Sequence, residues 1–511
     1  MTRGWCNTSW FSYLVLATAG AMFPLALAPL FWWPLGLLSG AILYWQLTSC
    51  STARQAFVRT WWYGLGQFGA GVSWVYVSMH DHGGTPAWLA IPMVAVFAAF
   101  LATFPAAWMA ARQRWFGQTL AWLTFPVFWF LHEWFRSWFM TGFPWLFVGD
   151  AHLATWLAGW APLLGSYGLS FIVLLTVTSL SQGWRQRQPA YLLFLLLWPM
   201  GAWLQGVEWT QRSGELQVSA VQGNVPQELK WKREQIEPTI ATYFGESRQL
   251  WQSDVILWPE TAMTLLYDRF RPYMDALAEE AQQHNTTIIT GIPYRHPPGT
   301  ELAGQYHNSV VAIGNGQGMY HKQRLVPFGE YVPLENLIRG WIPFFDLEMS
   351  SFLAGDAYQP PLLVRQQNGD EESLFLLAPF ICYEIAYPGL VRRNASNADL
   401  LITVSNDAWF GDSLGPKQHL ALAQMRALET QRYVLRATNT GITALINSDG
   451  EIVERLPFEQ VATLTASAEM RQGMTPYMIW GLWPLYLLSA IILLVARRQQ
   501  RTQALTAVPS N

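Results

Sequence analysis

The chain has 511 residues, of which 51% are hydrophobic and only 13% are charged, and its formal net charge at pH 7 is −3. A charged fraction far below the roughly 25% of soluble domains indicates a membrane protein. The 29 Trp and 28 Phe agree with this, because aromatic side chains gather at membrane–water interfaces. A charge balance this close to neutral gives no reason to expect a nucleic-acid partner.

Long uncharged runs predict the membrane-spanning segments, since one spanning helix takes about 20 mostly apolar residues. The first run, residues 4–53, is divided near Pro29 and Pro34 into two spans, the first of which we interpret as an uncleaved helix. Further runs cover residues 60–80, 82–111, 115–132, 151–184, 188–207 and 472–496. Eight transmembrane helices are therefore predicted, and residues 138–160 are expected to be re-entrant or interfacial.

Arginines in the short loops predict the orientation of these helices. Cytoplasmic loops carry the excess of Lys and Arg, and here the arginines fall in every second loop, with Arg136 as the exception. Both termini are thus expected in the cytoplasm, and the long polar segment on the far side of the membrane. The expected domains are transmembrane helices one to seven in residues 1–207, an extramembrane domain in 208–471, helix eight in 472–499 and a cytoplasmic tail in 500–511.

Residues 208–471 have the pattern of an α/β domain. Short runs rich in β-branched residues predict strands at 216–221, 255–258, 287–291, 309–313, 374–382, 400–404 and 442–446. Longer helical patterns cover 232–251, 272–284 and 415–432. Strands that alternate with helices over this length predict sheets covered by helices.

Two sites in this domain, one acidic and one basic, carry side chains suited to catalysis. Each lies near a strand end, where α/β folds collect functional groups. Glu260 follows Trp258 and Pro259, and the proline stiffens the backbone there. Lys322 precedes Glu330 across a Val-Pro-Phe-Gly turn. Taken alone, Glu260 could be an ordinary loop carboxylate, and the lysine and its acidic neighbour a solvated surface patch.

A third point is Cys382, which closes a hydrophobic strand two positions before Glu384. A cysteine in such a place is more often a small core residue. An acidic neighbour is unusual for an inert core thiol, and an unpaired thiol on the oxidising side of a membrane suggests reactivity. Cys382 alone leaves both interpretations open, whereas Cys6 and Cys50 are interpreted as packing residues.

The ordered set Glu260, Lys322 and Cys382 resembles the Glu-Lys-Cys triad of the carbon–nitrogen hydrolase (nitrilase) superfamily, and the fused membrane helices narrow the resemblance to the apolipoprotein N-acyltransferase family. The resemblance covers nearly the whole chain and implies a periplasmic αββα sandwich beside the polytopic helical domain, in a Gram-negative inner membrane. Further phrases that resemble the family are VSAVQGNVP at 218–226 with Trp231 close behind, GFPW at 142–145 and SNDAWF at 405–410.

The resemblance implies a role for each of these groups. Glu260 would act as general base and acid, Lys322 would stabilise the oxyanion, and Cys382 would be the nucleophile. The expected supporting residues are Tyr383, through its backbone N–H, Glu330 and Glu384, which would orient Lys322 and the incoming amine, Trp231 and Trp409.

The resemblance also implies the reaction. A phospholipid would give its sn-1 acyl chain to the thiol, and the thioester would pass the chain to the α-amino group of the diacylglyceryl-cysteine of an apolipoprotein, in ping-pong order. The expected partners are phospholipid, apolipoprotein and membrane lipids around a monomer, without metal or organic cofactor. Two other classes are possible: a membrane-tethered amidase or nitrilase that releases product to water, and a transporter with a periplasmic binding domain, which would place charges within its spans.

Two further segments allow a functional and a structural interpretation. The apolar stretch 341–347, with Phe344 and Phe345, could dip into the outer leaflet as a lid that excludes water, or it could be a buried core loop. His80, Asp81 and His82 could suggest a metal site, but they lack a third ligand group nearby, so none is expected.

Overall fold

The computed structural model describes residues 9–331 and 351–506 and divides the chain into two compact units. The first is drawn from Met1–Tyr76, Pro86–Val207 and Trp480–Asn511, and the second from Val77–Thr85 and Glu208–Ile479. The short loop Val77–Thr85, which lies between two apolar helices in the sequence, therefore belongs to the polar domain.

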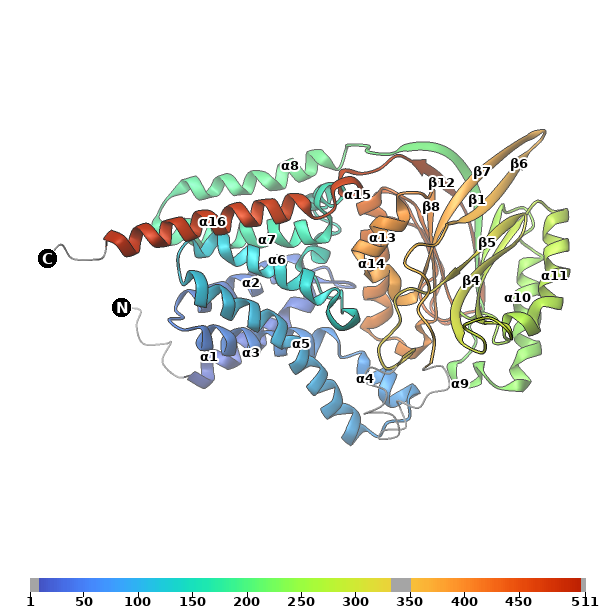
Figure 1. Cartoon of the computed structure of the whole chain (residues 1–511), viewed down its shortest axis with the longest axis horizontal. Helices are drawn as coiled ribbons and strands as arrows, with labels where there is room; N and C mark the ends of the chain where they lie inside the picture. Colours follow the sequence, from blue (N-terminus) through green and yellow to red (C-terminus); the bar gives the residue numbers. More distant parts are fainter. Residues whose placement is uncertain (1–8, 332–350, 507–511) are drawn as a thin grey trace. The chain divides into compact units, whose positions relative to one another are not determined.

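The first unit is a bundle of helices that lie side by side (Figure 1) and overlap the eight predicted spans of the sequence. Among the described helices, Ala87–Phe116 and Trp156–Gln186 are long and apolar enough to cross a membrane, while Trp10–Ala26 and Pro189–Leu204 are apolar but shorter. The count of eight spans and their orientation stay predictions. The helices are α1 (Ser9–Met22), α2 (Trp33–Thr48), α3 (Ala53–Gly71), α5 (Ala87–Phe116), α6 (Ala121–Arg136), α7 (Ala161–Gln186), η6 (Pro189–Leu196) running into α8 (Leu197–Leu204), and α16 (Trp483–Thr506).

Glycines allow α1 and α3 to approach closely. A Cβ atom at Gly20 of α1 would lie 1.9 Å from the carbonyl oxygen of Tyr63, and one at Gly66 of α3 would lie 1.9 Å from that of Ala17. Small residues at helix crossings are typical of membrane bundles, where tight packing holds the helices together.

Buried charges on α6 hold the irregular chain that follows it. Glu133 Oε1 accepts a hydrogen bond from the Val148 N–H at 2.9 Å, and Arg136 Nη1 donates to the carbonyl oxygens of Phe143 and Trp145 at 2.6 and 2.7 Å. Residues 138–160 contain short 3-10 helices and no continuous helix, and their expected re-entrant or interfacial position stays a prediction. The 3-10 helices are η3 (Phe139–Thr141), η4 (Val148–His152) and η5 (Trp156–Trp160).

The second unit contains one long ribbon of strands, hydrogen-bonded in the order β11-β10-β9-β8-β7-β6-β5-β4-β3-β2-β1-β12. β1 with β2, β2 with β3, β7 with β8 and β8 with β9 pair in parallel, and the other neighbours are antiparallel. The strands are β1 (Gln211–Gln222), β2 (Val255–Leu257), β3 (Thr287–Arg295), β4 (Tyr306–Gly314), β5 (Gly316–His321), β6 (Leu362–Asn368), β7 (Glu371–Ile381), β8 (Leu400–Ser405), β9 (Val434–Thr438), β10 (Ala444–Ile446), β11 (Ile452–Arg455) and β12 (Ala462–Gln472).

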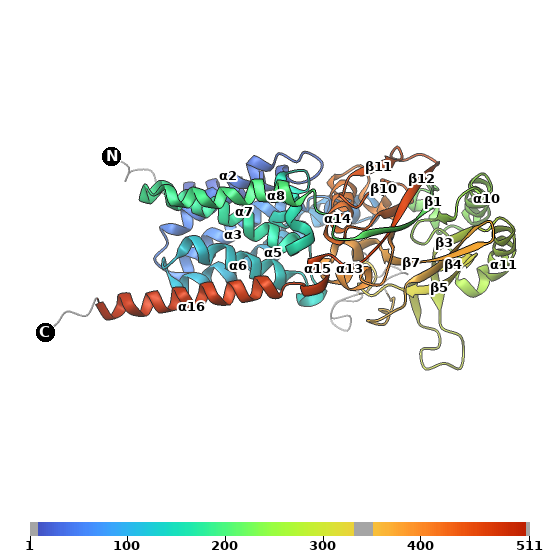
Figure 2. The ribbon, with the colours of Figure 1, turned by 90° about the horizontal axis from the view of Figure 1, so that it is seen from above.

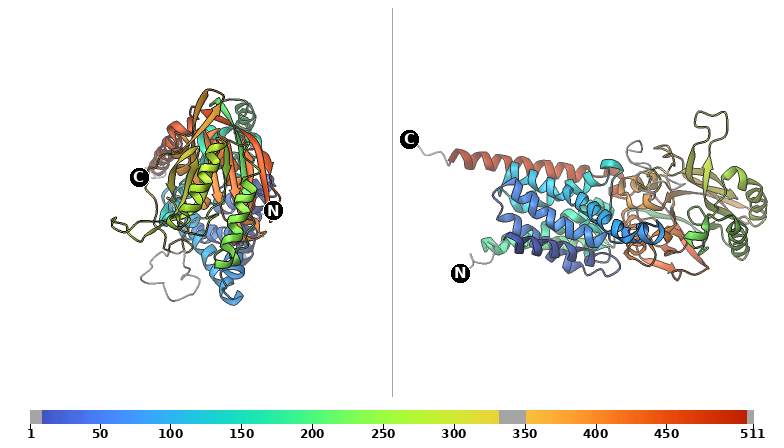
Figure 3. Two further views of the ribbon diagram at one scale, coloured as in Figure 1. Left: turned by 90° about the vertical axis from the view of Figure 1, so that its right-hand side faces the viewer. Right: turned by 90° about the horizontal axis from the view of Figure 1, so that it is seen from below.

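The two halves of this ribbon face each other across a single apolar core. Alternate side chains of a strand point to opposite faces: Val255 and Leu257 join the core between the halves, whereas Ile256 packs with the outer helices. Those outer helices are α10 (Ile236–Ser247) and α11 (Tyr267–Gln283), which lie across the sheet face in Figure 3.

Helices α13 (Pro388–Ala395) and α14 (Leu414–Thr430) cover the opposite side, so that the strands lie between two helical layers (Figure 2). This arrangement is the αββα sandwich expected of residues 208–471.

Candidate functional site

Three strand ends position the predicted catalytic side chains. Glu260 lies just beyond β2, Lys322 directly follows β5, and Cys382 directly follows β7 and begins the 3-10 helix η9 (Cys382–Ala386). Cys382 has a φ of +53°, which a non-glycine residue adopts rarely and which persists only where the surrounding structure holds it. The sharp turn between β7 and η9 therefore sets the thiol at a strand end beside the other two groups.

Lys322 and two carboxylates form a buried ionic cluster. Lys322 Nζ lies 3.3 Å from Glu260 Oε1 and 2.8 Å from Glu330 Oε1, and its side chain is 1% exposed. Asn308 on β4 donates from its Nδ2 to the same two oxygens, at 2.7 and 2.9 Å. Burial alone would lower the pKa of Lys322, but the charges of Glu260 and Glu330 raise it above its usual value, so the ammonium is held charged and fixed.

Glu260 is held ionised by its surroundings. Burial acts to raise the pKa of Glu260, but the Lys322 ammonium, the Asn308 amide, the charge of Lys230 and the Asn406 N–H together lower it below its usual value. The Asn406 N–H donates to Oε2 at 2.9 Å, and Lys230 Nζ donates to the backbone carbonyl of Glu260 at 3.2 Å. A carboxylate in this state can accept a proton.

Cys382 keeps part of its surface accessible. Burial and the charge of Glu260 raise the pKa of the Cys382 thiol above its usual value, and the charge of Lys322 offsets only part of this rise. The resting site therefore pairs a protonated thiol with an ionised carboxylate. Such a pair is suited to general-base catalysis, in which the proton leaves sulfur as sulfur attacks.

Glu384 joins the segment that follows Lys322 to the turn at Cys382 by accepting main-chain hydrogen bonds. Its Oε1 accepts hydrogen bonds from the Gln323 and Arg324 N–H groups and from the Tyr320 hydroxyl, at 2.6, 3.1 and 2.9 Å, and its Oε2 accepts from the Ile381 N–H at 2.8 Å. Burial raises the pKa of Glu384 to about 7, while these donors favour the ionised form. Glu384 therefore positions Lys322 and Cys382 by fixing their neighbours.

The remaining predicted residues lie in different surroundings. Tyr383 follows Cys382 and is 9% exposed, Trp231 is 41% exposed, and the Trp409 ring lies 6.3 Å from the ring of His82. Phe344 and Phe345 lie outside the described residues. Of the residues weighed as a metal site, His80 Nδ1 contacts the Thr85 carbonyl at 2.8 Å and His82 Nδ1 contacts Glu228 Oε1 at 3.1 Å.

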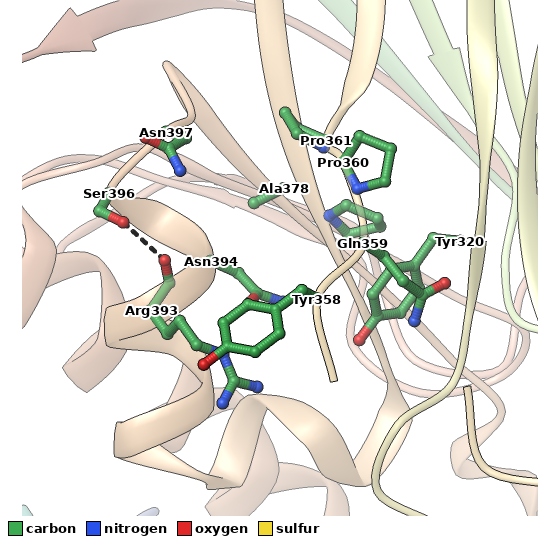
Figure 4. Close-up of a pocket in the computed structure, with 11 residues that line it drawn as sticks. Tyr320, Tyr358, Gln359, Pro360, Pro361, Ala378, Arg393, Asn394, Ser396 and Asn397 are labelled. Atoms are coloured by element: carbon green, nitrogen blue, oxygen red, sulfur yellow. Dashed lines mark hydrogen bonds between the residues drawn. The ribbon is translucent and has the colours of Figure 1, made fainter. Parts of the chain in front are cut away.

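A cavity of about 390 Å³ was not anticipated from the sequence, and it is lined in part by Tyr320, whose hydroxyl donates to Glu384 Oε1. Figure 4 shows its wall of Tyr320, Tyr358, Arg393 and neighbouring prolines. The Arg393 guanidinium carbon lies 5.5 Å from the centre of the Tyr358 ring, and its Nη2 donates to Gln323 Oε1 at 2.9 Å. The cavity thus borders the segment that follows Lys322.

Asn308 and Lys230 belong to the site but were not anticipated from the sequence. Asn308 lies within β4 and Lys230 directly precedes Trp231, and both side chains are almost fully buried, at 3% exposure. Asn308 lies between His307 and Ser309, before the apolar run of β4 begins at Val310, so no sequence pattern marked it. A lysine at the end of a short polar helix, α9 (Gln227–Lys230), resembles any surface lysine.

Comparison with known families gives one match within the helical part of the chain and one within the α/β domain. A family described as carbon-nitrogen hydrolase matches residues 217–473, and one described as apolipoprotein N-acyltransferase N-terminal domain matches residues 19–179.

Full-length relatives are similar over almost the whole chain. A protein of Pseudomonas aeruginosa (strain LESB58) named apolipoprotein N-acyltransferase is 44% identical over 510 residues, covering 97% of each chain. A protein of the same name from Photobacterium profundum is 38% identical over 515 residues, covering 96% of each. Among solved structures, Nit3 of Saccharomyces cerevisiae, described as a member of branch 10 of the nitrilase superfamily, is 16% identical with a TM-score of 0.36, covering 52% of this chain and 92% of its own.

Proposed function

Because the chain belongs to the apolipoprotein N-acyltransferase family, we propose that it N-acylates lipoproteins by means of Glu260, Lys322 and Cys382. The donor is a membrane phospholipid, which gives up its sn-1 acyl chain. The acceptor is the α-amino group of the N-terminal diacylglyceryl-cysteine of an apolipoprotein. The product is the mature, N-acylated lipoprotein.

In the first half-reaction the acyl chain moves to the enzyme. Cys382 Sγ bonds to the ester carbonyl carbon while its proton passes to Glu260. The resulting oxyanion is stabilised by the Lys322 ammonium and the Tyr383 N–H, because donors fixed in advance stabilise charge as it develops. The carbon–oxygen bond then breaks, Glu260 returns the proton to the departing lysophospholipid oxygen, and a thioester remains on Cys382.

In the second half-reaction the amine replaces sulfur. The neutral α-amino nitrogen bonds to the thioester carbonyl carbon and gives a proton to Glu260. The carbon–sulfur bond breaks, and the Cys382 thiolate recovers the proton from Glu260, which restores the resting site. One carboxylate thus serves both half-reactions, as ping-pong acyl transfer requires.

The helical segments anchor this reaction in the bacterial inner membrane. Eight spans, in residues 1–207 and 472–499, place residues 208–471 in the periplasm and both termini, including the tail 500–511, in the cytoplasm. The overlap of eight helical segments with the apolar runs and the spacing of loop arginines support this topology. The enzyme acts as a monomer on membrane lipids, without cofactor.

The observation that carries the proposal is the contact between Glu260 and Lys322, 62 positions apart in the chain, in a cluster whose charges act on the Cys382 thiol. A base, a cation and a nucleophile are the three groups that acyl transfer needs.

The test is transfer by the purified protein in phospholipid vesicles with a diacylglyceryl lipopeptide. Wild type and the control Cys50→Ala, which removes a buried cysteine of the helical unit, should form the N-acyl lipopeptide, whereas Cys382→Ala should form none. Release of free fatty acid without N-acylation by the wild type would instead identify a membrane-tethered hydrolase. N-acylation by Cys382→Ala at the wild-type rate would refute the proposed nucleophile.

A further inference from the structure

Behind the cysteine turn lies a buried charged group that the proposed mechanism does not use. It consists of Asp407, His419 on α14 and Arg436 on β9, whose side chains are at most 4% exposed. Arg436 Nη2 donates to Asp407 Oδ2 at 2.6 Å, and His419 Nδ1 lies 3.1 Å from Asp407 Oδ1. Buried ionic groups are costly unless well paired, and they are no evidence of stability in themselves. Their presence beside a reactive turn therefore calls for a different explanation.

This group ends on the backbone of Cys382. His419 Nε2 lies 3.0 Å from the Cys382 carbonyl oxygen, which can only accept, so Nε2 must carry the hydrogen. Cys382 has the positive φ of +53°, a conformation that persists only where the surroundings hold it. The imidazole therefore restrains the peptide group that directs the thiol.

The segment that carries Asp407 also holds the proposed base. The Asn406 N–H donates to Glu260 Oε2 at 2.9 Å, and the Ser405 hydroxyl donates to Asp407 Oδ1 at 2.6 Å. A shift of Asp407 would thus move the support of both Glu260 and Cys382.

We propose that His419 is a positioning residue for acyl transfer: its Nε2–H holds the Cys382 carbonyl, and the Asp407–Arg436 pair holds the imidazole. The inference rests on the proposed function, since it concerns the nucleophile of that reaction. His419 does not touch the substrate and acts through Cys382.

Two conservative variants separate this role from a merely structural one. The side-chain amide of Gln reaches the place of Nε2, so His419→Gln retains a donor to the Cys382 carbonyl and loses the contact with Asp407. The amide of Asn reaches the place of Nδ1, so His419→Asn retains the contact with Asp407 and loses the donor to Cys382. If His419 positions Cys382, His419→Gln should form the thioester faster than His419→Asn. If His419 only stabilises the fold, the order of the two rates should be reversed.

The experiment measures single-turnover thioester formation on Cys382 from phospholipid by intact mass, together with the rate of Cys382 alkylation by iodoacetamide and the thermal midpoint of unfolding. His419→Asn should slow thioester formation by roughly 100-fold, the cost of a misplacement of about 1 Å, while His419→Gln stays within about tenfold of wild type although it unfolds at the lower temperature. Lys417→Gln, on the same helix and paired with exposed Asp412, should match wild type in both rates.

The inference is overturned if His419→Asn forms the thioester as fast as His419→Gln, or if both rates follow the order of unfolding temperatures. Absence of a thioester on wild-type Cys382 would overturn the proposed function instead. In that case the alkylation rates alone still decide whether His419 positions the thiol, because they require no acyl donor.

Discussion

Asn308 offers the sharpest test of how Glu260 is kept ionised. Its Nδ2 donates to Glu260 Oε1 and Glu330 Oε1 at 2.7 and 2.9 Å, so Asn308→Ala removes one donor from two carboxylates. A hydrogen bond to a charged group contributes about 1.5–3 kcal/mol. Since one pKa unit corresponds to about 1.4 kcal/mol, the pKa of Glu260 should rise by roughly one to two units.

The sign of the pH effect follows from the role of Glu260 as a base. The wild-type pKa of Glu260 lies below its usual 4.5, so wild-type thioester formation should change little between pH 8 and pH 5. In Asn308→Ala the base becomes protonated at a higher pH. Well below its pKa, the ionised fraction of Glu260 falls about tenfold for each unit by which that pKa rises, so the ratio of variant to wild-type rate should fall as the pH is lowered.

The assay is the single-turnover rate of thioester formation between pH 5 and pH 8. Asn315→Ala is the matched control, because Asn315 Nδ2 donates at 2.9 Å to the Arg365 carbonyl at the other end of β4 and should leave the pH profile unchanged. If the ratio of Asn308→Ala to wild type rises as the pH is lowered from pH 8 to pH 5, the reasoning about Glu260 is wrong.

Three further predictions concern stability. Glu384→Gln replaces one carboxylate oxygen by an N–H₂ group that must face hydrogen-bond donors, so the free energy of unfolding should fall by about 1.5–3 kcal/mol in denaturant titration; an unchanged midpoint would contradict this. Burial lowers the pKa of Lys230 to about 8 from 10.5, so between pH 8 and pH 10.5 the unfolded chain binds more protons than the folded one. The thermal midpoint of wild type should therefore rise relative to that of Lys230→Met from pH 8 to pH 10. A fall over this range would contradict the lowered pKa of Lys230. Gly66→Leu forces a side chain against the Ala17 carbonyl oxygen and should destabilise the helical unit by about 1–3 kcal/mol, seen as a lower temperature of thermal aggregation in detergent. Gly69→Leu, whose Cβ meets open space, should leave that temperature unchanged.

The sequence identifies the reactive residues of the site better than their supports. Glu260, Lys322 and Cys382 are recognised as an ordered set, although each alone also has a structural interpretation, and the structure brings them together. Lys230 and His419 do not stand out, because only tertiary packing buries a polar-helix lysine or aims an imidazole at a carbonyl. Contacts between distant segments of the chain decide these positions.

The same limit applies to the fold. Predicted strands such as 400–404 coincide with β8, because a fully buried parallel strand is a continuous apolar run. β12 (Ala462–Gln472) was not predicted, since its small and polar residues carry a weak apolar pattern, and its pairing with β1 over eleven positions supplies what the sequence lacks. β9 (Val434–Thr438) was missed because Arg436 interrupts it. Buried partners, above all Asp407 and the Ile442 carbonyl, make that arginine compatible with the core.

The most direct measurement is intact-mass analysis of the protein after incubation with phospholipid that is isotopically labelled in its sn-1 acyl chain. The proposed thioester predicts a mass increase of one labelled acyl group. This increase should be located on Cys382 by peptide mapping and lost when a diacylglyceryl lipopeptide amine is added. An unmodified Cys382 in protein that still N-acylates the lipopeptide would contradict it.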